Sequence, residues 1–122
     1  MGEVTLRLLV LRSSDMARTA RFYELLGIHF ERERHGTGPE HLAGQVGSTV
    51  LEIYPQADGS DSVGVRLGFG VPSVDAVVAA VSEVGGKVVS PAKSSPWGYR
   101  AVVADPDGRR VEITSQTLAE GV

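Results

Sequence analysis

The feature that most restricts how this chain can fold is an internal repeat, since each half carries the pattern of one strand, one helix and three further strands. The two halves span residues 1–57 and 62–118. Modules of about 55–60 residues bury too little surface to be stable alone, so the two must pair. We therefore expect residues 1–122 to form one domain built of both modules.

The first half begins with residues 4–12, which are rich in Val and Leu and predict a buried strand. Asp15 is placed to cap the helix that follows, because its side-chain oxygen can accept hydrogen bonds from the first backbone amides. Gly27 is placed to end that helix, because glycine adopts the left-handed backbone conformation at little cost. Three short strands are then predicted at residues 28–34, 40–46 and 48–55.

The second half repeats this order. Residues 62–71 alternate between Val, Leu or Phe on one face and mainly Gly or Arg on the other, which predicts a strand. Residues 72–86 predict a helix with an early proline and a Gly-Gly stop. Three further strands are predicted at residues 87–91, 99–104 and 109–115.

Composition excludes several classes of protein. Hydrophobic residues make up 42% and charged residues 22% of the sequence, as in ordinary soluble globular proteins. The net charge of −3 gives no electrostatic surface for nucleic acid. We expect no membrane span, no signal peptide and therefore a cytoplasmic protein. The absence of cysteine rules out a disulfide framework and a thiol nucleophile.

Two segments carry a family resemblance, LRSSDMARTARFYELLGI at residues 11–28 and GGKVVSPAKSSPWGYRAVVADPDGRRVEI at residues 85–113. They resemble the first strand-to-helix turn and the last hairpin of the vicinal oxygen chelate superfamily, the glyoxalase I, bleomycin-resistance and extradiol dioxygenase group. The resemblance implies an α+β fold in which two βαβββ modules form curved mixed sheets around a cavity, usually completed in a homodimer. It implies no single reaction, because this fold hosts lyases, isomerases, dioxygenases and binding proteins.

Metal-dependent members of this superfamily hold one divalent ion with four side chains that face the cavity, typically two His and two Glu. The matching positions here are Leu8 and Arg66 for the histidines, and Glu52 and Glu112 for the carboxylates. Leucine has no donor atom, and a guanidinium group repels a divalent ion. Because Ni²⁺, Zn²⁺ and Fe²⁺ prefer imidazole and carboxylate ligands, we expect no cofactor and no stoichiometric transition metal.

Alternation along the strands predicts where these side chains point. Glu52 and Tyr54 share one strand face, and Arg66 lies opposite the apolar face of its own strand. If the fold is as implied, Arg66, Glu52 and Glu112 converge in an otherwise apolar pocket with Leu8. Two interpretations stay open: Arg66 neutralises a glutamate and closes the cavity, or the charged cluster orients a polar or ionic ligand.

Histidine and tryptophan supply the remaining candidates. His35 and His41 flank a Gly-rich turn and could be cross-strand neighbours, but they lack a recognised ligand spacing, which favours a surface or hydrogen-bonding role. His41 is also a candidate to border the cavity. Trp97 could be an aromatic lid over a ligand or a hydrophobic plug against the neighbouring module. Residues 31–36, ERERHG, alternate in charge and predict a solvated edge.

The expected function is binding of a small molecule in the sheet-lined cavity, similar to the metal-independent antibiotic-binding branch of the superfamily. The alternative is an enzyme of lyase, isomerase or dioxygenase type that uses Glu52 or Glu112 as a base or metal ligand. A structural dimer without a ligand is also left open. Expected partners are a second copy of the chain and a small molecule. The candidate ligand-binding residues are Arg66, Glu52, Glu112, His41, Tyr54, Trp97 and Leu8.

Overall fold

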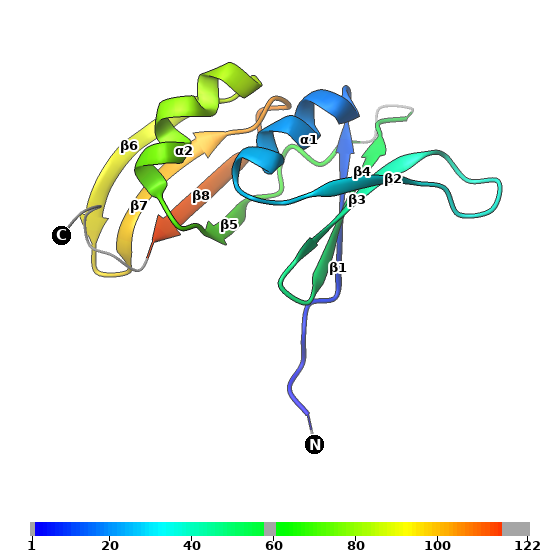
Figure 1. The fold of residues 1–122 in the computed structure, drawn as a ribbon, viewed down its shortest axis with the longest axis horizontal. Coiled ribbons are helices and arrows are strands. Elements are labelled where there is room, and N and C mark those ends of the chain that lie inside the picture. The colour runs from blue at the N-terminus through cyan, green and yellow to red at the C-terminus, as the bar shows by residue number, and fades with distance from the viewer. Residues whose placement is uncertain (1, 58–60, 116–122) are drawn as a thin grey trace.

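The structure, a computed structural model, describes residues 2–57 and 61–115 and contains two successive modules of the same plan (Figure 1). The first module consists of β1 (Leu8–Ser13), α1 (Met16–Leu25), β2 (Phe30–Glu33), β3 (His41–Val46) and β4 (Thr49–Pro55). The second consists of β5 (Leu67–Gly70), α2 (Val74–Ala80), the short 3-10 helix η1 (Val81–Val84), β6 (Lys87–Ser95), β7 (Gly98–Ala104) and β8 (Arg110–Ser115).

Each module forms one four-stranded mixed sheet. The strand order is β1-β4-β3-β2 in the first sheet and β5-β8-β7-β6 in the second. In both sheets the first strand pairs in parallel with the last, and all other neighbours are antiparallel. The identical order confirms the α+β class and the tandem repeat expected from the sequence.

The helix boundaries follow from capping residues. Asp15 accepts a hydrogen bond from the backbone N–H of Arg18 at 3.1 Å, and Gly27 has a positive φ of 109°, so both predicted ends of α1 are confirmed. In the second module Ser73 caps α2 by accepting from the backbone N–H of Ala76. The helix expected over residues 72–86 is shorter, because its last turn tightens into η1.

Two strands begin later than the sequence predicts. The strand expected at residues 4–12 starts at Leu8, and the one expected at residues 62–71 starts at Leu67. In each case the partner strand is too short to extend the ladder, since β4 starts at Thr49 and β8 at Arg110. A strand needs a partner for its backbone groups, and apolar composition alone cannot supply one.

The two modules share a single hydrophobic core, as their small size requires. The helix α1 contacts β3, β4 and η1, while α2 contacts β6, β7 and β8, so the helix-covered sides of both sheets meet. Tyr23 of α1 reaches Phe69 of β5 with 6.0 Å between ring centroids. The alternate residues that fill this core from the central strands are Leu51, Ile53, Val103, Val111 and Ile113.

A buried polar network, which we call the Arg109 network, joins the modules at the turn before β8. Arg109 is fully buried, and its guanidinium bonds the carboxylate of Asp105, the backbone carbonyl of Arg12 at 2.6 Å and that of Ser62 at 2.9 Å. Tyr23 donates its hydroxyl to Asp105 at 2.7 Å. Burial and the neighbouring Asp105 charge raise the pKa of Tyr23. The network therefore ties α1 and the end of β1 to the second sheet.

None of the helices in the described part of the chain combines the length and apolar composition needed to cross a membrane.

Candidate functional site

Each sheet has one face without a helix, and the candidate polar residues lie on these two faces. The first open face carries Glu52 and Tyr54 from β4, and the second carries Glu112 from β8. Their apolar neighbours Ile53 and Ile113 point the other way into the core. The strand faces predicted from the sequence are therefore correct.

On the second open face, Glu112 lies between two arginines. Arg66 Nη2 is 3.7 Å from one carboxylate oxygen, and Arg100 Nη2 is 2.7 Å from the other. The side chain of Arg66 is 59% exposed and that of Glu112 is 35% exposed. The predicted contact between Arg66 and Glu112 is confirmed, but it is a half-exposed pair in one chain and not a buried one.

These arginines border a pocket of about 210 Å³. The pairing of β6 with β7 sets Lys93 beside Arg100, so a third cation lines the same hollow. The full lining is Arg66, Ser90, Pro91, Lys93, Arg100, Ala101 and Val102. The arrangement can hold an anionic group, because three cations face one carboxylate.

Glu52 does not join this cluster, so the expected convergence of both glutamates on Arg66 is wrong within one chain. Instead, Glu52 lies 3.6 Å from Nε2 of His41. The reason is the way the modules pack. Since the helix-covered sides of the two sheets meet in one core, each open face lies on the side of its sheet away from that core.

His41 is the first residue of β3, on the first open face, and is only 1% exposed. Its ring stacks on Tyr54 with centroids 4.1 Å apart and planes 8° apart, and on His35 at 5.0 Å. Arg12 covers the far side of the Tyr54 ring. The predicted neighbourhood of His35 and His41 is confirmed, whereas a surface role does not describe the buried His41.

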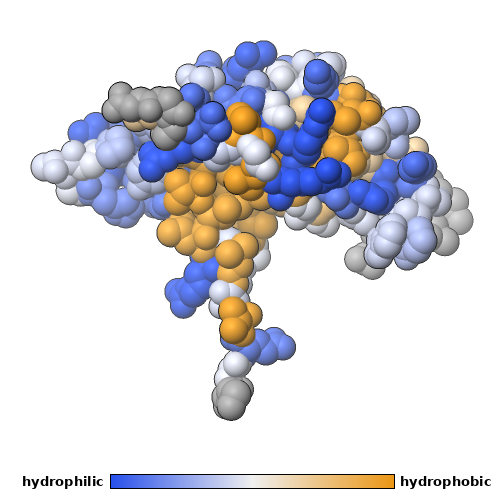
Figure 2. Space-filling view, turned by 180° about the vertical axis from the view of Figure 1, so that it is seen from behind, coloured by the Kyte–Doolittle hydropathy of each residue, from blue (hydrophilic) through white to orange (hydrophobic). Residues whose placement is uncertain are grey.

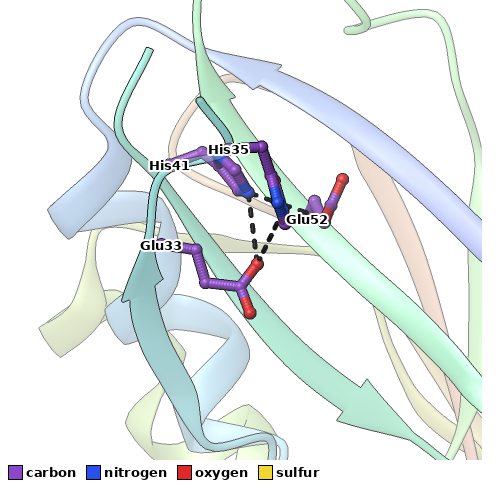
Figure 3. Close-up of side chains that lie close together, drawn as sticks. All are labelled: Glu33, His35, His41 and Glu52. Atoms are coloured by element: carbon purple, nitrogen blue, oxygen red, sulfur yellow. Dashed lines mark ion pairs between the residues drawn. The ribbon is translucent and has the colours of Figure 1, made fainter. Parts of the chain in front are cut away.

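Four possible ligand groups meet beside this stack (Figure 3). They belong to Glu33, His35, His41 and Glu52, and one N or O atom from each lies within 4.8 Å of all the others. Glu33 Oε1 is 3.3 Å from Nε2 of both histidines. Glu33 belongs to the segment predicted as a solvated edge, and that prediction is confirmed, since β2 is an edge strand and the Glu33 side chain is 42% exposed.

Leu8 and Trp97 lie at the surface. Leu8 is 53% exposed at the start of β1, and Trp97 is 75% exposed in the turn between β6 and β7. The interpretation of Trp97 as a plug against the other module is therefore wrong within one chain. Its role as a lid stays a prediction.

An apolar cleft of about 320 Å³ separates the two modules at the edges of their sheets. Figure 2 shows apolar side chains gathered where the first residues of the chain leave the body of the molecule. Leu6 and Leu9 line the cleft from one side, and Leu67 and Phe69 line it from the other. Val4 and Leu6 are themselves exposed, which leaves a substantial apolar surface uncovered in one chain.

Sequence reasoning missed Arg100, Arg109 and Glu33. The strand face on which Arg100 lies could be read from the sequence, because Arg100 alternates with the apolar Ala101 and Val103. Its partner Glu112 could not be read, because only the register of β7 against β8 brings the two side chains together. Arg109 follows a turn and stands beside a second arginine, so no sequence pattern marks it as buried.

Comparison with known proteins identifies the family. Residues 5–113 match the family described as the Glyoxalase/Bleomycin resistance protein/Dioxygenase superfamily. No curated protein matches the sequence. Among solved structures, the chain is similar to TnmS3, an antibiotic binding protein from Streptomyces sp. CB03234, with 25% identity over 94% of this chain and 98% of that one, and a TM-score of 0.73.

Two further structures show the same similarity. A glyoxalase-related enzyme from Fulvimarina pelagi is 26% identical over 91% of this chain and 87% of that one, with a TM-score of 0.68. A glyoxalase/bleomycin resistance protein from Streptomyces sp. CB03234 is 25% identical over 90% and 99%, with a TM-score of 0.69. With its two βαβββ modules and a family match over nearly its whole length, the chain belongs to the Glyoxalase/Bleomycin resistance protein/Dioxygenase superfamily.

Proposed function

We propose that this protein binds a small organic molecule with an anionic group, in a cavity that two copies of the chain complete, without the superfamily's usual metal. The observation that carries the proposal is the charge of the pocket on the second open face. Arg66, Lys93 and Arg100 surround it, and within the described residues Glu112 is the single carboxylate that pairs with these arginines. The excess positive charge favours a ligand with a carboxylate or phosphate group.

Arg100 is the residue best placed to recognise such a group. Its Nη2 is held by Glu112 at 2.7 Å, which fixes the guanidinium plane. Its Nε is buried and has no hydrogen-bond partner among the described residues. A buried donor without a partner costs free energy, and a bidentate anionic ligand would remove that cost.

The size of the pocket supports a composite site. Its 210 Å³ is below the range of about 300–1,000 Å³ that is typical of ligand pockets. The first open face holds a separate hollow of about 600 Å³, lined in part by Glu31 and Glu33. A two-fold pairing that sets this hollow of one copy opposite the basic pocket of its partner would bring Glu31 and Glu33 toward Arg66, Lys93 and Arg100 and enlarge the cavity.

The sheet edges support pairing as well. Among the described residues β1 pairs with β4 alone and β5 pairs with β8 alone, so each sheet has an open edge beside the apolar cleft. Exposed apolar residues flank this region, namely Val4, Leu6, Leu8 and Val63. Open edges and uncovered apolar surface are both stabilised by a second chain.

The usual metal has no place in this proposal, because two residues at the matched positions cannot act as metal ligands. Leu8 offers no donor atom, and the Arg66 guanidinium already neutralises the Glu112 carboxylate that would otherwise bind the ion. Similarity to an antibiotic binding protein supports binding, while the equal similarity to a glyoxalase-related enzyme keeps catalysis as the alternative.

A matched ligand series tests the proposal. Aromatic carboxylates and phosphates, each paired with its neutral amide or alcohol, are screened by thermal shift and then by calorimetry. We expect the anionic members to bind at least about tenfold more tightly, because a charge-assisted hydrogen bond contributes about 1.5–3 kcal/mol. Arg100→Gln should abolish that preference, whereas Arg21→Gln on the exposed surface of α1 should not. Equal binding of neutral and anionic members would refute the proposal.

A further inference from the structure

We infer that Glu33, His35, His41 and Glu52 form a binding site for a divalent transition metal, best suited to Zn²⁺, at a place where the superfamily's usual ion does not lie. Three of the four ligands come from β2, the loop after it and β3, none of which carries a position of the usual site. Glu52 is the single residue common to both. The inference depends neither on dimer formation nor on the organic ligand proposed above.

The spacing of the four groups fits tetrahedral coordination. Zinc takes imidazole nitrogens and carboxylate oxygens at about 2.0–2.2 Å, which places neighbouring ligand atoms about 3.4 Å apart. The distances here are 3.3 Å from Glu33 Oε1 to each histidine Nε2 and 3.6 Å from His41 Nε2 to Glu52 Oε2. Small rotations of the exposed side chains are enough to close the remaining separations, which do not exceed 4.8 Å.

The buried His41 supplies an independent observation. Its Nδ1 lies 3.2 Å from the backbone carbonyl of Pro39, and since a carbonyl only accepts, the ring hydrogen belongs on Nδ1. Nε2 is then left with its lone pair directed toward the carboxylates of Glu33 and Glu52. It has no hydrogen-bond partner in the described chain and is shielded from water. A lone pair facing two carboxylates is repulsive unless a cation lies between them.

The surroundings hold the site in place before an ion arrives. The stack on Tyr54 fixes the plane of the His41 ring, and the Pro39 carbonyl fixes its orientation, as carbonyls commonly do for metal-bound histidines. The buried His41 and the 13% exposed Glu52 lie on neighbouring strands, while the more exposed Glu33 and His35 complete the site (Figure 3). An ion could therefore enter without unfolding the sheet.

The rival explanation is a proton on Nε2, which would make His41 a cationic partner of the two glutamates. In that arrangement the Nε2–H group would donate a hydrogen bond to a carboxylate. In the structure neither carboxylate accepts one, although both lie within 3.6 Å. A metal ion accounts for the short distances and the missing hydrogen bond together, and the zinc titration decides between the ion and the proton. Two imidazoles with two carboxylates select Zn²⁺, Ni²⁺ or Co²⁺ over Mg²⁺ and Ca²⁺, and the two carboxylates balance the ion's charge.

Zinc titration of the full chain tests the inference. The protein is freed of tag and metal with a chelator, and ZnCl₂ alone is added by calorimetry in a buffer that does not coordinate metals. We expect one Zn²⁺ per chain. The double variant Glu33→Gln, His35→Ala should weaken binding more than about 100-fold, beyond the tenfold to 100-fold that loss of an outer-shell partner costs. Both side chains are partly exposed, so the fold should survive, which circular dichroism checks.

The chain offers a matched control in His29 and Glu31, a similar pair on and beside β2, whose side chains are 82% and 77% exposed. The variant His29→Ala, Glu31→Gln removes the same residue types and should leave zinc binding unchanged, as should Glu112→Gln. His41→Gln should abolish binding; if that variant unfolds, the Glu33 and His35 variant decides. The inference is overturned by absent zinc binding, by equal weakening in the control, or by loss of binding in Glu112→Gln, which would place the ion at the usual site.

Discussion

Removal of the Arg109 side chain should destabilise the protein more than removal of any other arginine. The guanidinium is fully buried and serves four acceptors at once, namely the Asp105 carboxylate, the carbonyls of Arg12 and Ser62, and the Ser62 hydroxyl. Arg109→Met keeps most of the side-chain volume but leaves the Asp105 charge without its cationic partner. Breaking a buried ion pair on one side costs about 3–5 kcal/mol. Each carbonyl that loses its partner would add about 1–3 kcal/mol if water could not replace it.

The net cost should be about 3–5 kcal/mol, because water entering the vacated space satisfies part of the loss. Urea denaturation followed by circular dichroism measures it, at one fixed protein concentration so that any association does not alter the comparison. The neighbouring Arg110→Met is the matched control, since Arg110 is exposed and should change stability by less than about 0.5 kcal/mol.

A double-mutant cycle separates the ion pair from general packing. Asp105→Asn removes the charge that Arg109 neutralises, so Arg109→Met should cost less in that background than in the native chain. A cost below about 1 kcal/mol for Arg109→Met alone, or strictly additive costs, would refute the view that this network holds the modules together.

Three further outcomes are expected. Arg66→Ala should lower the free energy of unfolding by about 0–1 kcal/mol in urea denaturation, because the Arg66 side chain is 59% exposed. A buried pair would lose about 3–5 kcal/mol. A loss above about 2 kcal/mol would mean that the Arg66 side chain is covered in solution. Because the pKa of Tyr23 is raised, the folded state keeps a proton that the unfolded state loses above about pH 10. The free energy of unfolding should therefore be level below that pH and fall above it by up to about 1.4 kcal/mol per pH unit. The fall should be smaller in Tyr23→Phe, and identical profiles would contradict the assignment. Light scattering should give twice the chain mass of 12.9 kDa at micromolar concentration, and a mass of one chain would exclude the composite cavity.

Local features were predictable because their causes lie within a few residues. Asp15 and Gly27 mark the two ends of α1, because helix capping and the left-handed backbone conformation depend on residues close together in the sequence. The faces of Glu52 and Glu112 follow from strand alternation. Even the contact between Arg66 and Glu112 required only that β5 pair with β8 in the repeated order.

The separation of the two glutamates was not predictable on the same grounds. Strand parity assigns a side chain to a face, but the relative placement of two faces depends on how the modules pack. The helix sides meet in this chain, so Glu52 turns to His41 and Glu112 to Arg100. The partnership of Glu33 with His41 has the same origin, since it needs the register of β2 against β3 across a loop that no periodic pattern describes.

The Arg109 network has a consequence for the symmetry of the repeat. The turn before β8 carries Asp105 and leads into Arg109, whereas the equivalent turn between β3 and β4 is only Gly47 and Ser48, without an acidic or basic side chain. Among the described residues, this polar link runs from the turn before β8 to the first half and has no counterpart at the turn before β4. A tandem of two first halves would reproduce the strand order of both sheets but lack this polar link between them. If the halves arose by duplication, their divergence at this turn gave each half a different role in joining the modules, so that one half can no longer replace the other.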